Sequence, residues 1–309
     1  MSTDDTLAEP FRRLMADICT PQVIRRTGSV SEDALWDLIE DSGFVDALLP
    51  ESRGGVGLSL PDVFPLIAAT GEYLLPLPFA ETMVARALLA GQDASIPERA
   101  TITLCYSPST LPAESDASYA IVQDGGRWNL VSLHQGNIGC HADFSVCAGK
   151  LDLLVVTAAL AAARMSGMMN RLMDMCLSYA NGREQFGRTL GKFQVVQHNL
   201  ALMAQQVASA NVAARIGMSS IDFDQNRVAV AKIRASEAAQ LVSSQAHALH
   251  GAIGMTHELD LHLYTHQLQQ LRMACGSERY WAENLGKEYL SQARGGCIDF
   301  VRDALQEVD

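Results

Sequence analysis

The chain has 309 residues, of which 48% are hydrophobic and 19% charged, and its formal net charge is −12 at pH 7. This length and composition allow a sizeable buried core in one to three structural units. No block of Lys and Arg offsets the acidic balance, which argues against nucleic acid as a partner. The first ten residues are polar and acidic and unlike a signal peptide, so a cytoplasmic location is expected.

The most apolar run covers residues 151–163, includes Asp152 and ends at Arg164. Because about 20 apolar residues are needed to cross a bilayer, we expect no membrane span and interpret the run as buried protein. The seven cysteines are scattered without a C-x-x-C pair, which favours reduced, mostly buried thiols. His262 and His266 are four residues apart but lack the following base of zinc enzymes, so no metal site is predicted.

The first zone, residues 1–95, is predicted to be an N-terminal helical domain. Apolar residues recur at helical spacing around 35–39 and again around 63–67. Between them, residues 48–58 contain Pro50 and three glycines, which break helices and favour a fixed loop.

The second zone, residues 96–150, is predicted to form a shortened β middle domain with a small antiparallel sheet. Its β-prone pieces are 100–105, 119–123, 128–133 and 144–147. The third zone, residues 151–309, is rich in Ala, Leu, Met and Gln and predicts a C-terminal four-helix bundle, which makes the chain mainly α. Its expected helices cover roughly 151–181, 193–220, 227–250 and 269–292.

Two polar, glycine-marked linkers interrupt these helices. The first offers a permanently charged guanidinium at Arg183, an amide at Gln185 and an aromatic face at Phe186, a set suited to an anionic, ring-bearing ligand. The second offers the backbone of Gly251 and Gly254, whose N–H groups are candidates for contact with a phosphate. Taken alone, an Arg and a Phe at a helix end are more often a surface charge and a core aromatic than a ligand site.

The two linkers and their spacing resemble the acyl-CoA dehydrogenase family. The family segments R-x-[QT]-F-G, F-Q and H-G-G-x-G-[FM]-T-x-E correspond here to residues 183–187, 193–194 and 250–258. The N-terminal segment 50–57 looks like the family's P-E-x-x-G-G-x-G loop, and residues 260–264 are especially like a bacterial branch. Pattern, order and spacing agree over roughly two hundred residues.

The resemblance implies a site for FAD in which these segments hold the adenosine and pyrophosphate against a neighbouring subunit. Arg183 would neutralise the pyrophosphate, Phe186 and Gln194 would surround the dinucleotide, and the backbone of residues 250–252 would approach the phosphates. Two residues depart from the family pattern: Ala252 replaces a common second glycine, and Ala248 a common glutamine. The implied cofactor-binding residues are Arg183, Gln185, Phe186, Phe193, Gln194, His250, Gly251, Ala252 and Gly254.

The resemblance also exposes a missing catalytic group. Desaturation of a thioester needs a carboxylate to remove the α proton while the flavin takes the β hydride. The two places where the family carries this glutamate hold Cys275 and Thr157 here. Glu278 is a weak candidate three positions late, and Glu184 and Glu258 lie within the flavin-binding segments.

The middle zone is about half the family's usual length and lacks its T-E-x-x-x-G-S-D-like motif. The resemblance therefore implies the short subunit of an FAD-dependent acyl-CoA dehydrogenase, paired with a full-length homologue. Bacterial relatives linked to steroid or dicarboxylate acyl-CoA breakdown are paired in this way. An acyl-CoA would be the substrate and electron-transfer flavoprotein the acceptor. The alternatives are a self-sufficient homo-oligomeric enzyme with an unorthodox base and a non-catalytic scaffold of the same fold.

Overall fold

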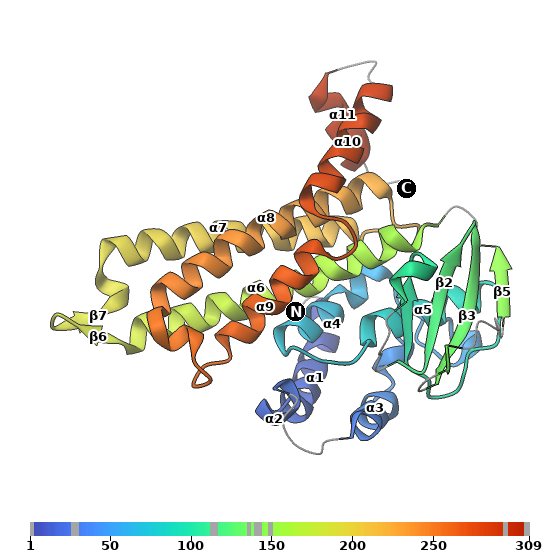
Figure 1. Ribbon diagram of the computed structural model, residues 1–309, viewed down its shortest axis with the longest axis horizontal. Coiled ribbons are helices and arrows are strands. Elements are labelled where there is room, and N and C mark those ends of the chain that lie inside the picture. The colour runs from blue at the N-terminus through green and yellow to red at the C-terminus, as the bar shows by residue number, and fades with distance from the viewer. Residues whose placement is uncertain are drawn as a thin grey trace. The chain divides into compact units, whose positions relative to one another are not determined.

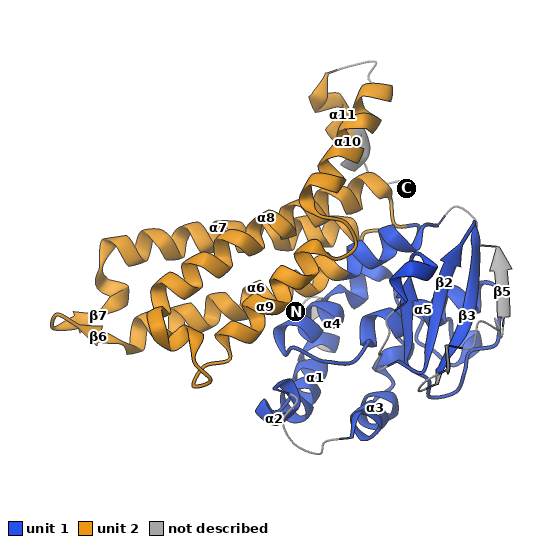
Figure 2. Ribbon diagram, in the orientation of Figure 1, with its two compact units in different colours: residues 1–160, 220–222 blue, residues 161–219, 223–309 orange. Residues whose placement is uncertain are grey.

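The computed structural model describes residues 3–25, 31–111, 117–134, 137–138, 144–147, 151–292 and 296–305. The chain divides into two compact units (Figure 2): unit 1 contains residues 1–160 and 220–222, and unit 2 contains residues 161–219 and 223–309. The described part of the chain is mainly helical (Figure 1), as the sequence predicted. Each unit is described separately below.

The helices of unit 1 precede its sheet, and two of them coincide with the apolar periodicities at 35–39 and 63–67. The second of these, α4, begins with a capping box in which the Ser59 N–H donates to Asp62 Oδ2 at 3.0 Å. Val63, Phe64, Leu66 and Ile67 of α4 are buried. The unit 1 helices are α1 (Thr3–Ile18), α2 (Pro21–Ile24), α3 (Glu32–Asp41), α4 (Leu60–Glu72) and α5 (Phe79–Gly91).

The predicted fixed loop is held by its own backbone. The Gly57 N–H donates to the Leu49 carbonyl at 2.7 Å, and the Leu58 N–H donates to the Ala47 carbonyl at 2.9 Å. A Cβ atom on Gly55 would lie 2.2 Å from the Leu49 oxygen, so only glycine fits there.

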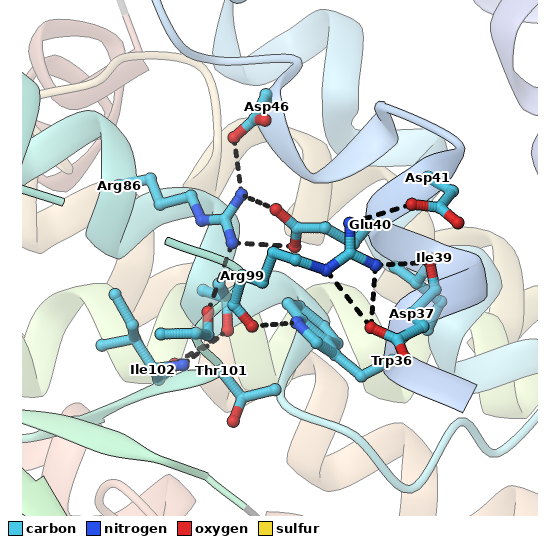
Figure 3. A network of polar contacts seen from close by, with 12 residues as sticks. Trp36, Asp37, Ile39, Glu40, Asp41, Asp46, Arg86, Arg99, Thr101 and Ile102 are labelled. Atoms are coloured by element: carbon cyan, nitrogen blue, oxygen red, sulfur yellow. Dashed lines mark hydrogen bonds and ion pairs between the residues drawn. The ribbon is translucent and has the colours of Figure 1, made fainter. Parts of the chain in front are cut away.

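A buried arginine joins three segments of unit 1 (Figure 3). Arg86 of α5 is 3% exposed and bonds both carboxylate oxygens of Glu40 through its two terminal nitrogens, at 2.9 and 2.8 Å. The same guanidinium contacts Asp46 at 2.8 Å and the Ala100 carbonyl at 3.2 Å. Hydrogen bonds to Glu40 and Asp46 raise the pKa of Arg86 although burial alone would lower it.

The sheet of unit 1 is mixed, so the expectation of an antiparallel sheet was wrong in one pairing. β1 pairs parallel with β2, while β2–β3, β3–β4 and β3–β5 are antiparallel. The connection after β1, which includes the 3-10 turn η3 (Pro108–Thr110), is longer than a hairpin and so leaves room for a parallel crossover. The strands are β1 (Ile102–Cys105), β2 (Tyr119–Asp124), β3 (Arg127–His134), β4 (Asn137–Ile138) and β5 (Phe144–Cys147).

Unit 2 is a helical bundle. An amide pair between Asn170 and Asn211, at 2.8 and 3.4 Å, joins α6 to α7. Burial raises the pKa of the Cys176 thiol of α6 to about 12, which makes it unreactive. The helices are α6 (Leu153–Gly182, whose first residues lie in unit 1), α7 (Gln194–Gly217), α8 (Gln225–His250), α9 (Leu261–Met273), α10 (Glu278–Gln292) and α11 (Cys297–Leu305).

Helix α6 matches the helix expected over residues 151–181 and continues well beyond the apolar run 151–163. With 30 residues it is long and apolar enough to cross a membrane by length and composition, but 78% of its apolar window is buried within the protein. This burial is typical of the core helix of a soluble protein.

The single helix expected over residues 269–292 is broken, and this expectation was wrong. Between α9 and α10, Cys275 and Gly276 both adopt left-handed backbone angles, with φ of +54° and +88°. Lys232 of α8, which is fully buried, donates from Nζ to the carbonyls of Leu271 and Arg272 at 2.8 and 2.9 Å and so caps the end of α9. The periodicity continued across the break, so the apolar pattern did not reveal it.

Candidate functional site

The first linker forms a tight β-hairpin after α6 (Figure 1). β6 (Glu184–Gln185) pairs antiparallel with β7 (Arg188–Thr189). The two residues of the turn, Phe186 and Gly187, have φ angles of +52° and +76°, as a type I′ turn requires. Phe186 is 91% exposed, so the hairpin presents an aromatic ring at its tip.

Arg183 lies at the base of this hairpin with its side chain exposed. Its N–H donates to the Tyr179 carbonyl at 2.9 Å, and its carbonyl accepts from the Leu190 N–H at 2.9 Å. The backbone at Arg183 is therefore held on both sides, which fixes the point from which the guanidinium extends.

Arg188 adds a second cation that the motif did not point to. Its guanidinium carbon lies 4.1 Å from the centroid of the Phe193 ring, a cation–π geometry. The Phe186 and Phe193 rings meet edge to face with centroids 6.3 Å apart. The sequence feature that could have predicted this contact is an arginine, Arg188, followed five residues later by an aromatic residue, Phe193. Gln194, the first residue of α7, is exposed beside this cluster.

The second linker forms the 3-10 turn η5 (Gly251–Met255) directly after α8. His250 is 5% exposed, and its Nδ1–H group donates to the Ala246 carbonyl at 2.9 Å. Its ring stacks on that of Tyr179, with centroids 4.4 Å apart and planes inclined by 31°. The imidazole of His250 therefore packs inward, whereas Gly251, Ala252 and Met255 are the exposed residues of the turn.

The two glycines of this linker differ from the expectation that their N–H groups face a phosphate. The Gly251 N–H donates to the His247 carbonyl, and Gly254 is buried, where an added Cβ would lie 2.7 Å from Leu261. Gly251 is needed for its backbone, because φ and ψ of +62° and −142° are strained for other residues.

A groove of about 290 Å³ lies within unit 2 between the hairpin and the end of α8. It contains Gln185 of the hairpin and Ala248 and Leu249 from the end of α8, directly before the second motif. Among the described residues that line it, none is charged. They are Gln185, Leu190, Val195, Val196, Asn199, Leu200, Met203, Gln245, Ala248 and Leu249.

His247 lies on α8 between the groove and the turn. Its Nε2 lies 2.9 Å from Thr265 Oγ1 of α9. Burial, and then the charges of His250 and His262, lower the pKa of His247, so the neutral imidazole is favoured near neutral pH.

The positions considered for a catalytic base differ in their surroundings. Glu278 is engaged by Arg272, whose Nε lies 3.1 and 3.2 Å from its two oxygens. This hydrogen bonding lowers the pKa of Glu278. Cys275 is partly buried, and its carbonyl accepts from the Trp281 indole at 2.9 Å. In unit 1, the buried Thr157 hydroxyl donates to the Leu153 carbonyl at 2.8 Å.

Comparison with known proteins agrees with these features. Residues 151–290 match the family model of the acyl-CoA dehydrogenase C-terminal domain. Over 288 residues the chain is 28% identical to acyl-CoA dehydrogenase IpdE2 of Mycolicibacterium smegmatis, covering 84% of this chain and 90% of that relative.

Two solved structures share the fold. The ChsE4-ChsE5 complex from Mycobacterium tuberculosis superposes with a TM-score of 0.74 at 20% identity, covering 96% of this chain and 99% of that chain. Butyryl-CoA dehydrogenase from Megasphaera elsdenii gives a TM-score of 0.72 at 17% identity, covering 94% and 98%. The bundle and its two linkers thus define an oxidoreductase fold of the flavoprotein class. Residues 151–290 form an acyl-CoA dehydrogenase C-terminal domain.

Proposed function

We propose that this chain is a subunit of an FAD-dependent acyl-CoA dehydrogenase, which introduces a double bond between the α and β carbons of an acyl-CoA thioester. Its contribution is the half-site for the adenosine and pyrophosphate of FAD. The observation that supports this most is the groove, because it joins the R-x-Q-F-G hairpin to the end of α8 in one unit.

The residues of the two linkers fit such a dinucleotide. The guanidinium of Arg183 is exposed and offers paired donors to a pyrophosphate. Phe186 and Phe193 offer aromatic faces, and the bare backbone at Gly251 lets a ligand approach closely. Gln185, Asn199 and Gln245 place carboxamides in an otherwise apolar groove, which suits a neutral heterocycle. FAD, when bound, supplies the hydride acceptor of the reaction.

The proposal assigns the catalytic base to a different polypeptide. A general base works best with a pKa near the operating pH, whereas Arg272 lowers that of Glu278. Thr157 and Cys275 occupy the two places where a glutamate is expected from the family pattern. A partner with its own carboxylate would complete the reaction centre.

The surface of α7 supports association with another chain. Within α7, which is described throughout, Arg215 is the one residue with a permanent charge. Its exposed positions include Val195, Ala201, Ala208 and Val212. By contrast α10 carries Glu278, Arg279, Glu283, Lys287 and Glu288. A long, uncharged, exposed helix face on an acidic protein is typical of a subunit interface.

The identity of the partner is part of the proposal. The related ChsE4-ChsE5 structure is a complex of two different chains, which favours a heteromer with a full-length homologue over a homo-oligomer. We extend the proposal to an acyl-CoA substrate, to electron-transfer flavoprotein as acceptor and to a cytoplasmic location.

The first test measures bound flavin. The chain is purified alone and co-expressed with a full-length homologue, and FAD per chain is determined from the absorbance of oxidised flavin. We expect stoichiometric flavin in the complex and reduction of that flavin by an acyl-CoA. No complex and no flavin would refute the proposal. Flavin reduction by the isolated chain, abolished by Glu278→Gln, would instead establish the self-sufficient alternative.

A matched pair of variants tests the half-site. Arg183→Gln removes the exposed cation of the hairpin, and we expect about tenfold weaker FAD binding because a hydrogen bond to a charged group is lost. Arg279→Gln removes an exposed arginine of α10, paired with Glu283, and serves as the control. Equal FAD affinity of the two variants would contradict the assignment of Arg183.

A further inference from the structure

The stack between Tyr179 and His250 connects the two linkers inside unit 2. Tyr179 lies in the last turn of α6, and its carbonyl accepts the Arg183 N–H at 2.9 Å. His250 is the last residue of α8 and directly precedes Gly251. One ring contact, with centroids 4.4 Å apart, therefore fixes the spacing between the start of the hairpin and the start of η5.

The orientation of His250 indicates that its ring holds the turn in position and does not contact a ligand. Its Nδ1–H group is committed to the Ala246 carbonyl one helical turn back, and its side chain is nearly fully buried. The imidazole is thus held at one edge by its own helix and across its face by the phenol ring of Tyr179.

The turn η5 packs against two histidines of α8, His247 and His250. A Cβ atom added at Gly254 would lie 3.1 Å from His250 Cβ and 3.5 Å from His247 Nδ1, so the backbone of η5 sits directly on both side chains. His247 is in turn joined to α9 through Thr265, at 2.9 Å. The position of the exposed Gly251–Ala252 backbone therefore depends on contacts to α6 on one side and to α9 on the other.

We propose that Tyr179 is a positioning residue for the dinucleotide half-site: by stacking on His250 it sets the distance between the Arg183 guanidinium and the Gly251–Ala252 backbone. This rests on the proposed function. The two segments have to contact one pyrophosphate together, and a shift of either would cost affinity without unfolding the bundle. Tyr179 contacts Arg183 through its carbonyl and His250 through its ring. It can therefore position both segments without contacting the ligand.

The test compares Tyr179→Ala with Tyr179→Phe, which keeps the ring. The probe is ADP, the part of FAD assigned to this chain, titrated calorimetrically into the full chain, with FAD titrated into the co-expressed complex. Tyr289→Ala is the matched control, because it removes an aromatic pair with Phe300, at 5.3 Å, elsewhere in unit 2. The melting temperature of each ligand-free variant is measured in parallel.

We expect Tyr179→Ala to bind ADP about three- to tenfold more weakly, the range given by the free energy of an aromatic pair. Tyr179→Phe and Tyr289→Ala should keep the wild-type affinity, and the two alanine variants should lose similar amounts of thermal stability. A purely structural role for Tyr179 would instead lower the melting temperature and leave the affinity of the folded protein unchanged.

The outcomes separate this proposal from the one it rests on. If the wild type binds ADP and Tyr179→Ala binds it equally well, the positioning role is overturned and the half-site stands. If Tyr179→Phe is as weak as Tyr179→Ala, the hydroxyl and not the stack is responsible, which also overturns it. If neither the wild-type chain nor its complex binds ADP or FAD, both proposals fail.

Discussion

Arg86 of unit 1 and Lys232 of unit 2 are both buried cations, but they are held in opposite ways. Arg86 of unit 1 lies between the carboxylates of Glu40 and Asp46, and these partners raise its pKa. Lys232 of unit 2 is held by Ser236 and by the Leu271 and Arg272 carbonyls, and burial lowers its pKa to about 8. Full charges compensate for desolvation, whereas dipoles compensate only in part. The first cation is a permanent ion-pair centre, and the second can lose its charge at mildly alkaline pH.

Breaking the ion-pair centre should have the largest effect. Arg86→Met leaves Glu40 and Asp46 facing each other's charge with no guanidinium between them. We expect a loss of about 3–5 kcal/mol in the free energy of unfolding, as when one member of a buried ion pair is removed. Urea unfolding followed by circular dichroism measures it. If Arg86→Met lost less free energy of unfolding than Lys232→Met does at neutral pH, the ion pairs of Arg86 would contribute less to stability than the hydrogen bonds of Lys232.

The pH dependence of unit 2 sharpens the contrast. Burial lowers the folded-state pKa of Lys232 from the ordinary lysine value of 10.5 to about 8, so the unfolded chain binds more protons between these two pH values. The charged lysine destabilises the folded state below pH 8, and this penalty is relieved as the pH rises from 8 towards 10.5.

The measurable quantity is a difference between two proteins. We expect the stability of the wild type relative to Lys232→Met to increase by about 2 kcal/mol between pH 7.5 and 10, because the lysine loses its charge in the folded protein but keeps it in the unfolded chain. Titration of other groups cancels in this difference. A flat difference would mean that the ammonium is not desolvated.

At neutral pH, Lys232→Met itself should have a moderate effect. It removes the donors to the two carbonyls that end α9, and we expect a loss of about 1–2 kcal/mol, reduced because the buried charge disappears as well. Lys287→Met on the exposed surface of α10 is the matched control. Equal stability of the two variants would show that the cap at α9 contributes nothing.

The smallest effect is expected at Arg99, which contacts Asp37 at 2.7 Å and Asp41 at 2.9 Å (Figure 3) but is exposed. Water and salt screen such pairs. The free energy of unfolding of Arg99→Ala should therefore equal that of the wild type within experimental error in 0.5 M salt. At this ionic strength the Debye screening length is on the order of a few ångströms. A loss as large as that of Arg86→Met would show that burial is not what separates the two arginines.

Much of the fold followed from local signals in the sequence. Helical periodicity predicted α3, α4 and the long helices α6, α7 and α8, and the β-prone pieces matched β1, β2, β3 and β5. Glycine and polar residues marked both linkers, because turns need special backbone angles that few residues adopt. The family motif then indicated FAD, although the roles of the individual binding residues stay predictions.

The features that were missed depend on contacts between distant segments. The break at Cys275 is stabilised by Lys232, some forty positions earlier, and a lone lysine in an alanine-rich helix gives no sign of this. The parallel pairing of β1 with β2 depends on the path of the connection and not on strand composition. Tyr179 and His250 are separated by two helices in the chain, so their stack could not be read from spacing.

The buried amine of Lys232 also provides a chemical probe of local unfolding. Acylating reagents reach a lysine only when its nitrogen is accessible and uncharged, and Lys232 is fully buried. Exposed lysines such as Lys192 and Lys287 will be modified at the intrinsic rate of the reagent, whereas Lys232 will be modified only when the segment between α9 and α10 detaches. Its labelling kinetics would therefore report how often this part of the bundle opens while the rest stays folded.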